Sequence, residues 1–164
     1  MTQPALSDSL PPAKQQPVKV LHVITRMIVG GAQENTLLTA AGIGQIPGYE
    51  VQLVSGADDG AEGELSVTNQ GISRFTIIRE MRRNINPVVD AVALWKLYRF
   101  MRQEKFDSVH TDLAKAGILG RIAARMAGVP IVVHGLHGMV FNDYQTWAVN
   151  RAYWAMQRLV DPLT

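Results

Sequence analysis

The segment that decides the fold is Val18-Lys19-Val20-Leu21-His22-Val23-Ile24, with Gly30-Gly31-Ala32-Gln33 following it after a short gap. The first stretch is apolar and β-branched and lies between a proline and a glycine pair, which predicts a buried strand. Apolar residues then recur at helical spacing over residues 32–43 and predict a helix that begins at the glycine turn. A strand, a glycine turn and a helix in this order are typical of an α/β domain.

The same alternation continues along the rest of the chain. Further strands are expected over residues 50–55, 73–78, 106–111 and 129–134. Further helices are expected over residues 65–69, 87–104, 114–127 and 144–159, with Asn86 as the cap of the second of these. The alternation predicts an α/β fold with a Rossmann-like parallel sheet, right-handed crossovers and helices on both faces.

Length and composition limit the classes of protein to which the chain can belong. Its 164 residues suit one ordinary domain, and its net charge of +2 gives no indication of a nucleic-acid partner. The absence of cysteine excludes disulfides, thiolate metal sites and cysteine nucleophiles, and it suits a cytoplasmic location. No apolar run reaches the roughly 18 residues that span a bilayer.

The first 17 residues differ from the rest of the chain. They are rich in proline, glutamine and serine and lack the basic start and apolar centre of a signal peptide. We expect residues 1–17 to be a flexible leader and residues 18–164 to form the folded domain.

The glycine turn is the first candidate binding site, because ligands bind beyond the carboxyl ends of parallel strands. Backbone amides of Gly30, Gly31 and Ala32 at a helix N-terminus could hold a phosphate, although a tight turn needs small residues in any case. The glycine spacing is not the dinucleotide fingerprint, and the next strand ends in Ser55-Gly56 rather than a carboxylate. A nicotinamide-dependent enzyme is therefore disfavoured, and only the nearby Asp58 keeps that alternative open.

Two more groups of polar residues follow later strands. His110 and Asp112, with Lys115 just after them, could bind sugar hydroxyls or accept a proton. In the alternative interpretation His110 only ends a strand and Asp112 caps the next helix. His134 and His137, with Gly138, form a loop in which we expect one structural histidine and one that faces the cleft. No metal site is expected there, because no third ligand has suitable spacing.

A set of basic residues has two interpretations. Such charges usually form a solvated surface, but they could also contact anionic lipid headgroups or a phosphate-bearing acceptor. The set comprises Arg79, Arg82, Arg83, Lys96, Arg99, Arg102 and Lys105.

These motifs, in this order, resemble family-4 glycosyltransferases, which have the GT-B fold. The resemblance covers residues 18–159 and is carried by residues 20–26, 29–35, 109–111, 115–121, 129–134 and 137–138. It implies one half of a GT-B architecture, in which the N-terminal domain holds the acceptor and a C-terminal domain holds the nucleotide-sugar donor. It also implies retention of anomeric configuration, a glycan or lipid-linked acceptor, no cofactor and no catalytic metal. Peripheral contact with the inner face of an anionic membrane is a further expectation.

The resemblance also implies roles for individual residues. Gly30, Gly31 and Ala32 correspond to the loop that contacts the donor phosphates. His110 and Asp112 are the candidate catalytic residues. The candidate acceptor-binding residues are Gln33, Lys115, His137 and Gly138.

Two departures from the family pattern limit this transfer. Family members often have a second histidine where this chain has Asp112, and an ionised carboxylate accepts but cannot donate a hydrogen bond. The chain also ends at Thr164, where the family continues into the donor domain, so we expect no transfer by this polypeptide alone. The alternative is a stand-alone module that binds a sugar or phosphate without catalysis.

Overall fold

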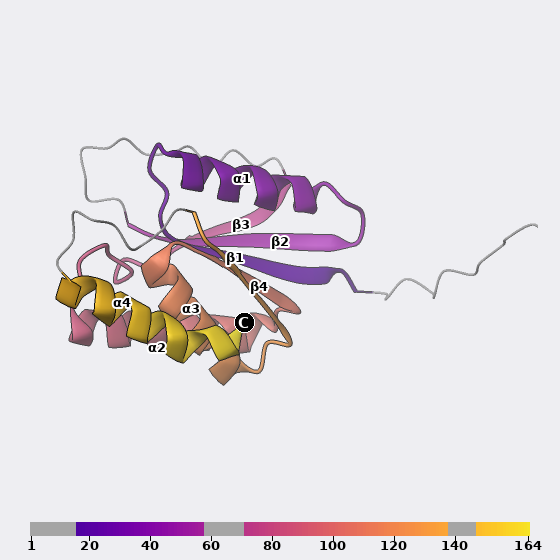
Figure 1. The fold of residues 1–164 in the computed structure, drawn as a ribbon. Coiled ribbons are helices and arrows are strands. Elements are labelled where there is room, and N and C mark those ends of the chain that lie inside the picture. The colour runs from indigo at the N-terminus through magenta and orange to yellow at the C-terminus, as the bar shows by residue number, and fades with distance from the viewer. Residues whose placement is uncertain (1–15, 58–70, 138–146) are drawn as a thin grey trace, which may run out of the picture.

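The computed structural model describes residues 16–57, 71–137 and 147–164. Its sheet contains β1 (Val18–Arg26), β2 (Tyr49–Gly56), β3 (Ile72–Ile77), β4 (Ser108–Asp112) and β5 (Ile131–Gly135). The five strands are parallel and lie in the order β3-β2-β1-β4-β5 (Figure 1). The predicted parallel α/β fold is confirmed.

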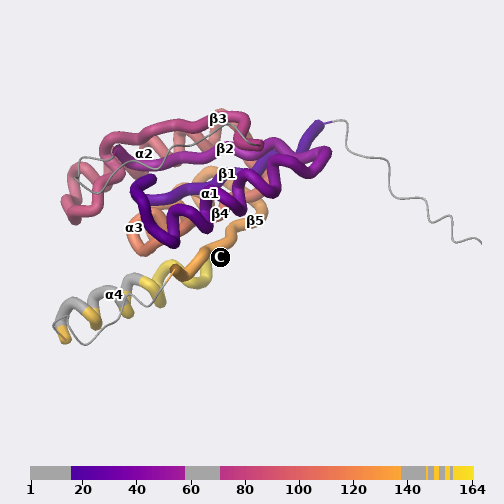
Figure 2. The backbone as a smooth tube through the Cα atoms, turned by 90° about the horizontal axis from the view of Figure 1, so that it is seen from above, coloured from indigo at the N-terminus to yellow at the C-terminus, as the bar shows by residue number. Residues whose placement is uncertain are grey.

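Helices cover both faces of this sheet, as predicted. Figure 1 shows α1 (Gly31–Gly44) on one side and α2 (Pro87–Glu104) and α3 (Ala114–Ala127) on the other. The fourth helix, α4 (Trp147–Val160), contacts α3 and lies at the margin of the domain (Figure 2). A short 3₁₀ helix, Asp161–Leu163, follows it. No helix among the described residues is long and apolar enough to span a bilayer.

The element boundaries agree with the sequence predictions to within a few residues. Asn86 caps α2 as expected, because its side-chain oxygen accepts hydrogen bonds from the backbone N–H groups of Val88 and Val89 at 3.1 and 3.2 Å. The expected strand at residue 106 begins at Ser108 instead, since Phe106 packs into the core before the strand starts. The expected helix at 65–69, most of the leader and residues 144–146 lie outside the described residues.

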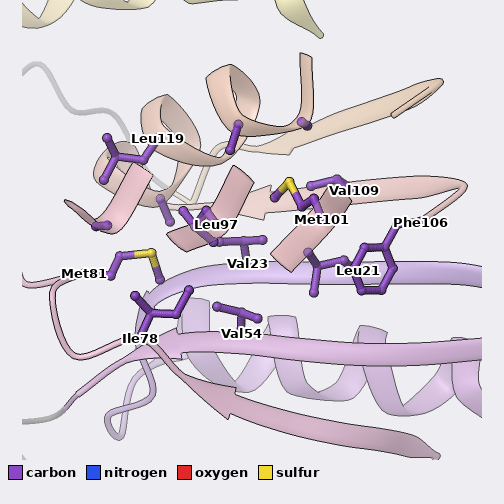
Figure 3. Packing of buried hydrophobic residues seen from close by; sticks show 14 of the residues in the cluster. Leu21, Val23, Val54, Ile78, Met81, Leu97, Met101, Phe106, Val109 and Leu119 are labelled. Atoms are coloured by element: carbon purple, nitrogen blue, oxygen red, sulfur yellow. The ribbon is translucent and has the colours of Figure 1, made fainter. Parts of the chain in front are cut away.

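The alternation of β1 divides the core into two layers. Leu21 and Val23 point toward α2 and α3, where they join the larger cluster of buried side chains that Figure 3 shows. Val20 and Ile24 point to the opposite side and pack with residues of α1. Because side chains alternate along a strand, His22 lies on the α1 side, where it is fully buried. This buried histidine marks the start of the polar site.

Candidate functional site

Three strands bring four polar side chains together on the α1 side of the sheet. In the strand register His22 of β1 is paired with His110 of β4, and Asp112 is paired with Gly135 of β5. His137 follows β5 by two residues. The site lies between β1 and β4, where the strand order reverses direction, and such switch points are where open α/β sheets bind ligands.

Asp112 is the centre of this group. Its Oδ1 atom lies 2.6 Å from Nε2 of His137 and 3.7 Å from Nε2 of His110. Its Oδ2 atom lies 3.7 Å from Nδ1 of His22. The rings of His22 and His110 are 4.8 Å apart between centroids. We call His22, His110, Asp112 and His137 the histidine–aspartate cluster.

The charges in this cluster follow from burial and from the neighbouring side chains. Burial by itself would raise the pKa of Asp112, but the side chains of His22 and His137 outweigh it and the pKa is lowered. Burial lowers the pKa of His110, and the opposing attraction of Asp112 is smaller. At neutral pH the site therefore contains an ionised carboxylate beside a neutral imidazole of His110. A neutral imidazole can accept a proton, and the carboxylate can stabilise the resulting cation.

Gly135 makes the close approach of the cluster residues possible. A Cβ atom at this position would lie 2.5 Å from Oδ1 of Asp112 and 3.0 Å from Nε2 of His137. Any side chain would therefore displace the carboxylate from its histidine partner. The alternation of strand residues places Gly135 on the cluster side, whereas His134 points to the other face and packs against Gly117.

His134 lies outside the cluster and connects β5 to β4. Its Nδ1 atom lies 3.0 Å from both the hydroxyl and the carbonyl oxygen of Thr111. Burial lowers the pKa of His134, with nearby Arg121 contributing in the same direction. The structure thus separates the two histidines of the loop, since His137 contacts Asp112 and His134 contacts the backbone of β4.

The interpretation of Asp112 as a helix cap is wrong. Asp112 is the last residue of β4, and Leu113 stands immediately before α3 without a side-chain capping hydrogen bond. The backbone of Leu113 has φ 70° and ψ 160°, a conformation that residues other than glycine rarely adopt. Such a conformation costs about 1–3 kcal/mol and tends to occur at functional sites.

A cavity of about 300 Å³ adjoins the cluster through Leu113. Gln33 and Lys115, two of the predicted acceptor-binding residues, both line it. Lys115 is paired with Asp90, whose Oδ1 atom lies 2.5 Å from the lysine Nζ, and it also donates to the carbonyl of Asn84. The predicted catalytic and acceptor-binding residues that the structure describes thus form two adjacent groups, one in the cavity and one in the cluster. Gly138 lies outside the described residues.

The glycine turn is open at the same edge of the sheet. Gly30 is the N-cap of α1, and a Cβ atom on Gly31 would have no neighbour within 4 Å. The side-chain oxygen of Gln33 lies against Gly30, at 2.8 Å from an added Cβ position, which connects the turn to the cavity. The N-terminus of a 14-residue helix therefore presents free amides beside the cavity.

The cluster also contains the described residues that come closest to a metal-binding arrangement. Ligand atoms of His22, His110 and Asp112 lie within 4.8 Å of one another. A tetrahedral zinc ion with ligands at about 2.1 Å would hold them about 3.4 Å apart. The 3.7 Å separations in the cluster are slightly wider than that spacing.

The predicted basic set is divided in the structure. Lys96 is paired with Glu80 at 2.6 Å, and Arg99 lies over the ring of Trp95 at 5.4 Å. Arg83 lines the cavity instead. Lys96 and Arg99 thus make side-chain contacts at the surface of α2, whereas Arg83 lies at the cavity.

Comparison with known proteins identifies the family. A family model described as "Glycosyl transferase 4-like domain" matches residues 30–161. The chain belongs to this family. The resemblance to family-4 glycosyltransferases that the motifs indicated is thereby confirmed.

A curated relative of this glycosyltransferase 4-like domain comes from Escherichia coli. Its name is UDP-Gal:alpha-D-GlcNAc-diphosphoundecaprenol alpha-1,3-galactosyltransferase, and it is 49% identical over 80 residues. The match covers 49% of this chain and 21% of the relative, so the chain corresponds to only part of that enzyme.

Solved structures resemble the glycosyltransferase 4-like domain in fold. MurG of Acinetobacter baumannii has a TM-score of 0.56 at 22% identity, covering 85% of this chain and 39% of the MurG chain. A putative UDP-N-acetylglucosamine 2-epimerase of Listeria monocytogenes has a TM-score of 0.59 at 14% identity, covering 88% of this chain and 38% of that one. At these identities the likeness shows the Rossmann-like fold alone.

Sequence reasoning missed His22. The residue stands within an apolar strand and was assigned only to that strand. Two signals could have revealed it, since alternation places it opposite Leu21 and Val23, and the parallel register places it beside His110.

Proposed function

We propose that this domain is the acceptor-side half of a retaining glycosyltransferase that uses a nucleotide-sugar donor. The observation that carries the proposal is the histidine–aspartate cluster, which lies at the same sheet edge as the open glycine turn and the cavity. One half of the site can bind diphosphate, and the other half contains a proton acceptor beside a carboxylate. Transfer of a sugar from a diphosphate to a hydroxyl needs a binding site for the diphosphate and a group that accepts the hydroxyl proton.

Each group has a defined role in this proposal. The amides of Gly30, Gly31 and Ala32 contact the donor diphosphate, whose charge the helix N-terminus stabilises. The acceptor lies in the cavity beside Gln33 and Lys115, with its hydroxyl toward His110. The bond from the anomeric carbon to the diphosphate breaks, the acceptor oxygen bonds to that carbon on the same face, and the hydroxyl proton goes to His110. Asp112 remains ionised and stabilises the protonated imidazole.

The E. coli relative suggests the substrate class. Its name specifies a UDP-sugar donor and an acceptor on a lipid diphosphate. We propose substrates of the same classes here, which would place the enzyme at the cytoplasmic face of a membrane as a peripheral protein. The donor-binding half belongs to a second domain, so we expect this chain alone to transfer no sugar.

A chimera tests the proposal. The whole domain of the E. coli galactosyltransferase that corresponds to this one is replaced by residues 18–164, and galactose transfer from UDP-galactose to a GlcNAc-diphospho-lipid is measured. We expect transfer by the chimera, none by the isolated chain, and a loss of at least about 100-fold in kcat for Asp112→Ala. Asp107, which accepts a hydrogen bond from the backbone of Lys19 at 2.9 Å, is a matched control as Asp107→Asn.

The outcomes separate the proposal from its alternative. Transfer that survives Asp112→Ala unchanged would remove the cluster from the reaction. A chimera that folds and binds the acceptor but transfers nothing would favour a binding module.

A further inference from the structure

His22 lies inside the domain with neither ring nitrogen in a hydrogen bond. Its side chain is fully buried, and both nitrogens lack a hydrogen-bond partner among the described residues. Oδ2 of Asp112 is also buried without a hydrogen-bond partner among these residues, and it lies 3.7 Å from Nδ1 of His22. Buried polar atoms that lack a partner destabilise a folded protein, and such atoms call for an explanation. A ligand that binds these atoms together would remove the cost.

The unsatisfied atoms lie close to a second imidazole. One ligand atom each from His22, His110 and Asp112 lies within 4.8 Å of the other two. Two imidazoles and one carboxylate are a ligand set that zinc accepts, with its fourth position left to water or to another ligand. A tetrahedral zinc ion holds its ligand atoms about 3.4 Å apart, so binding would close the widest of these gaps by about 1.4 Å at most.

The fourth residue of the cluster supports the carboxylate. Nε2 of His137 lies 2.6 Å from Oδ1 of Asp112, which leaves Oδ2 for an ion. Carboxylates that bind metal ions are usually held by such a hydrogen bond, which orients them and raises affinity. The side chains of His110 and His137 are 24% and 17% exposed, so an ion can reach the cluster from solvent.

We propose that His22, His110 and Asp112 bind a divalent transition-metal ion of the zinc type and that the bound ion stops sugar transfer. The second part rests on the proposed function, in which His110 accepts the proton of the acceptor hydroxyl. A neutral imidazole has one nitrogen with a free lone pair, and its other nitrogen carries the proton. When the free nitrogen binds a metal ion, the ring can accept no further proton. Zinc is thus an inhibitor of the reaction and takes no part in it.

Zinc binding by the purified 164-residue chain, prepared without a histidine tag, tests the site apart from any transfer. Calorimetry should show one zinc ion per chain with a Kd below about 10 µM, weaker than the structural zinc sites around which small domains fold. Magnesium, which prefers oxygen ligands, should not bind at the same concentration. Zinc should also raise the Tm of the chain, because it binds the folded state.

His22→Leu is the decisive variant, because it removes one ligand and keeps a side chain of similar volume. It should weaken zinc binding by more than about 100-fold, since loss of a group that only orients a ligand already costs about 10–100-fold. Asp112→Asn should weaken binding as well. The matched control is His134→Gln, which removes a histidine that contacts Thr111 and lies outside the cluster. The control should keep the zinc affinity, and circular dichroism checks that each variant is folded.

Transfer by the chimera tests the inhibition. Zinc should reduce galactose transfer in proportion to the occupancy of the site measured by calorimetry, and a chelator should restore the full rate. The transfer that a His22→Leu chimera retains should not respond to zinc at the same concentrations. This comparison also detects zinc that acts on the E. coli part of the chimera, because such an effect would persist in the variant.

The results separate the site from its consequence. Absence of zinc binding, or equal weakening by His22→Leu and His134→Gln, would overturn the metal site. If the chain binds zinc through His22 and an active chimera is not inhibited, the inhibitory role is wrong. If the chain binds zinc as expected but the chimera transfers nothing without zinc, the proposed function and the inhibitory role both fail while the metal site stands.

Discussion

Asp112 and His137 are 25 residues apart in the sequence, yet Oδ1 of Asp112 lies 2.6 Å from Nε2 of His137. The contact joins the end of β4 to the loop after β5, and Gly135 leaves the space in which it forms. A carboxylate that replaces a histidine of the family pattern is thus held by a histidine of the neighbouring strand end. In the proposed function, this pair holds the carboxylate that stabilises the protonated His110.

Gly135→Ala tests this relationship directly. The added Cβ atom would lie 2.5 Å from the carboxylate, so Asp112 must move away from His137. We expect transfer by the chimera to fall by about 100-fold, as small displacements of reacting groups do, while the fold is retained. Gly42→Ala is the control, because a Cβ atom there meets nothing within 4 Å. That change in a helix interior should instead stabilise the chain by about 0.5–1 kcal/mol in urea unfolding. Full activity in Gly135→Ala would contradict the role of the pair.

The cluster should make the protein sensitive to acid. The pKa of His110 is lowered in the folded state, mainly by burial, so folding favours its neutral form. The stability gained from this is present above the unfolded pKa of about 6.5 and is lost as pH falls through the lower folded pKa. Positive charge on His22, His134 or His137 would oppose the protonation of His110, whereas the carboxylate of Asp112 favours it.

Urea unfolding between pH 8 and pH 5 measures the effect of His110. The unsubstituted chain should lose stability over this range, and His110→Gln should lose less of it. Identical pH profiles for the two proteins would show that His110 has no shifted titration. In the chimera, transfer should stay constant from pH 8 through about pH 6.5 and fall only at lower pH, because the proposed base must be neutral and burial lowers the pKa of His110.

Gly31→Ala tests the proposed donor contact. No atom lies within 4 Å of the added Cβ atom, so the domain should fold and unfold as before. A methyl group at the helix N-terminus would keep the donor diphosphate from approaching the amides. We expect kcat/KM for the UDP-sugar in the chimera to fall about tenfold, which corresponds to about 1.4 kcal/mol. If KM for the acceptor changes instead, the glycine turn serves the other substrate.

Arg121 should hold the C-terminal segment against α3. Its guanidinium is almost completely buried and contacts the carbonyl of Gly117, Asp161 and Gln157 at 2.8, 3.2 and 3.1 Å. Arg121→Met should lower the free energy of unfolding by about 1.5–3 kcal/mol, the usual effect of losing hydrogen bonds to a charged group. Hydrogen exchange should accelerate in residues 147–164 more than in β1. Arg125→Met, on the exposed side of the same helix, should change neither measurement.

The sequence predicted the fold well because every strand and turn is signalled locally. Hydrophobic period, glycine turns and the Asn86 cap identify the elements without reference to neighbours in space. The site was less predictable because its contacts depend on register. Lys115 remains a predicted acceptor-binding residue, and its pairing with Asp90 is a contact that only the packing of α2 beside α3 reveals.

Asp112 is a second residue whose surroundings could not be predicted from the local sequence. An aspartate just before a helix usually caps it, and that rule predicts a purely structural role for Asp112. The structure ends β4 at Asp112 and turns the chain sharply at Leu113, so the carboxylate faces the neighbouring strands. Local propensity was overridden here by tertiary contacts with His22 and His137.

His22 has a consequence for the robustness of the molecule. Both of its ring nitrogens are buried without a hydrogen-bond partner among the described residues, a situation that weakens a folded protein. A leucine of similar volume would suit that layer better in energetic terms. Laboratory selection for heat resistance alone should therefore replace this histidine early, and the more stable variants that result should transfer sugar more slowly in the chimera.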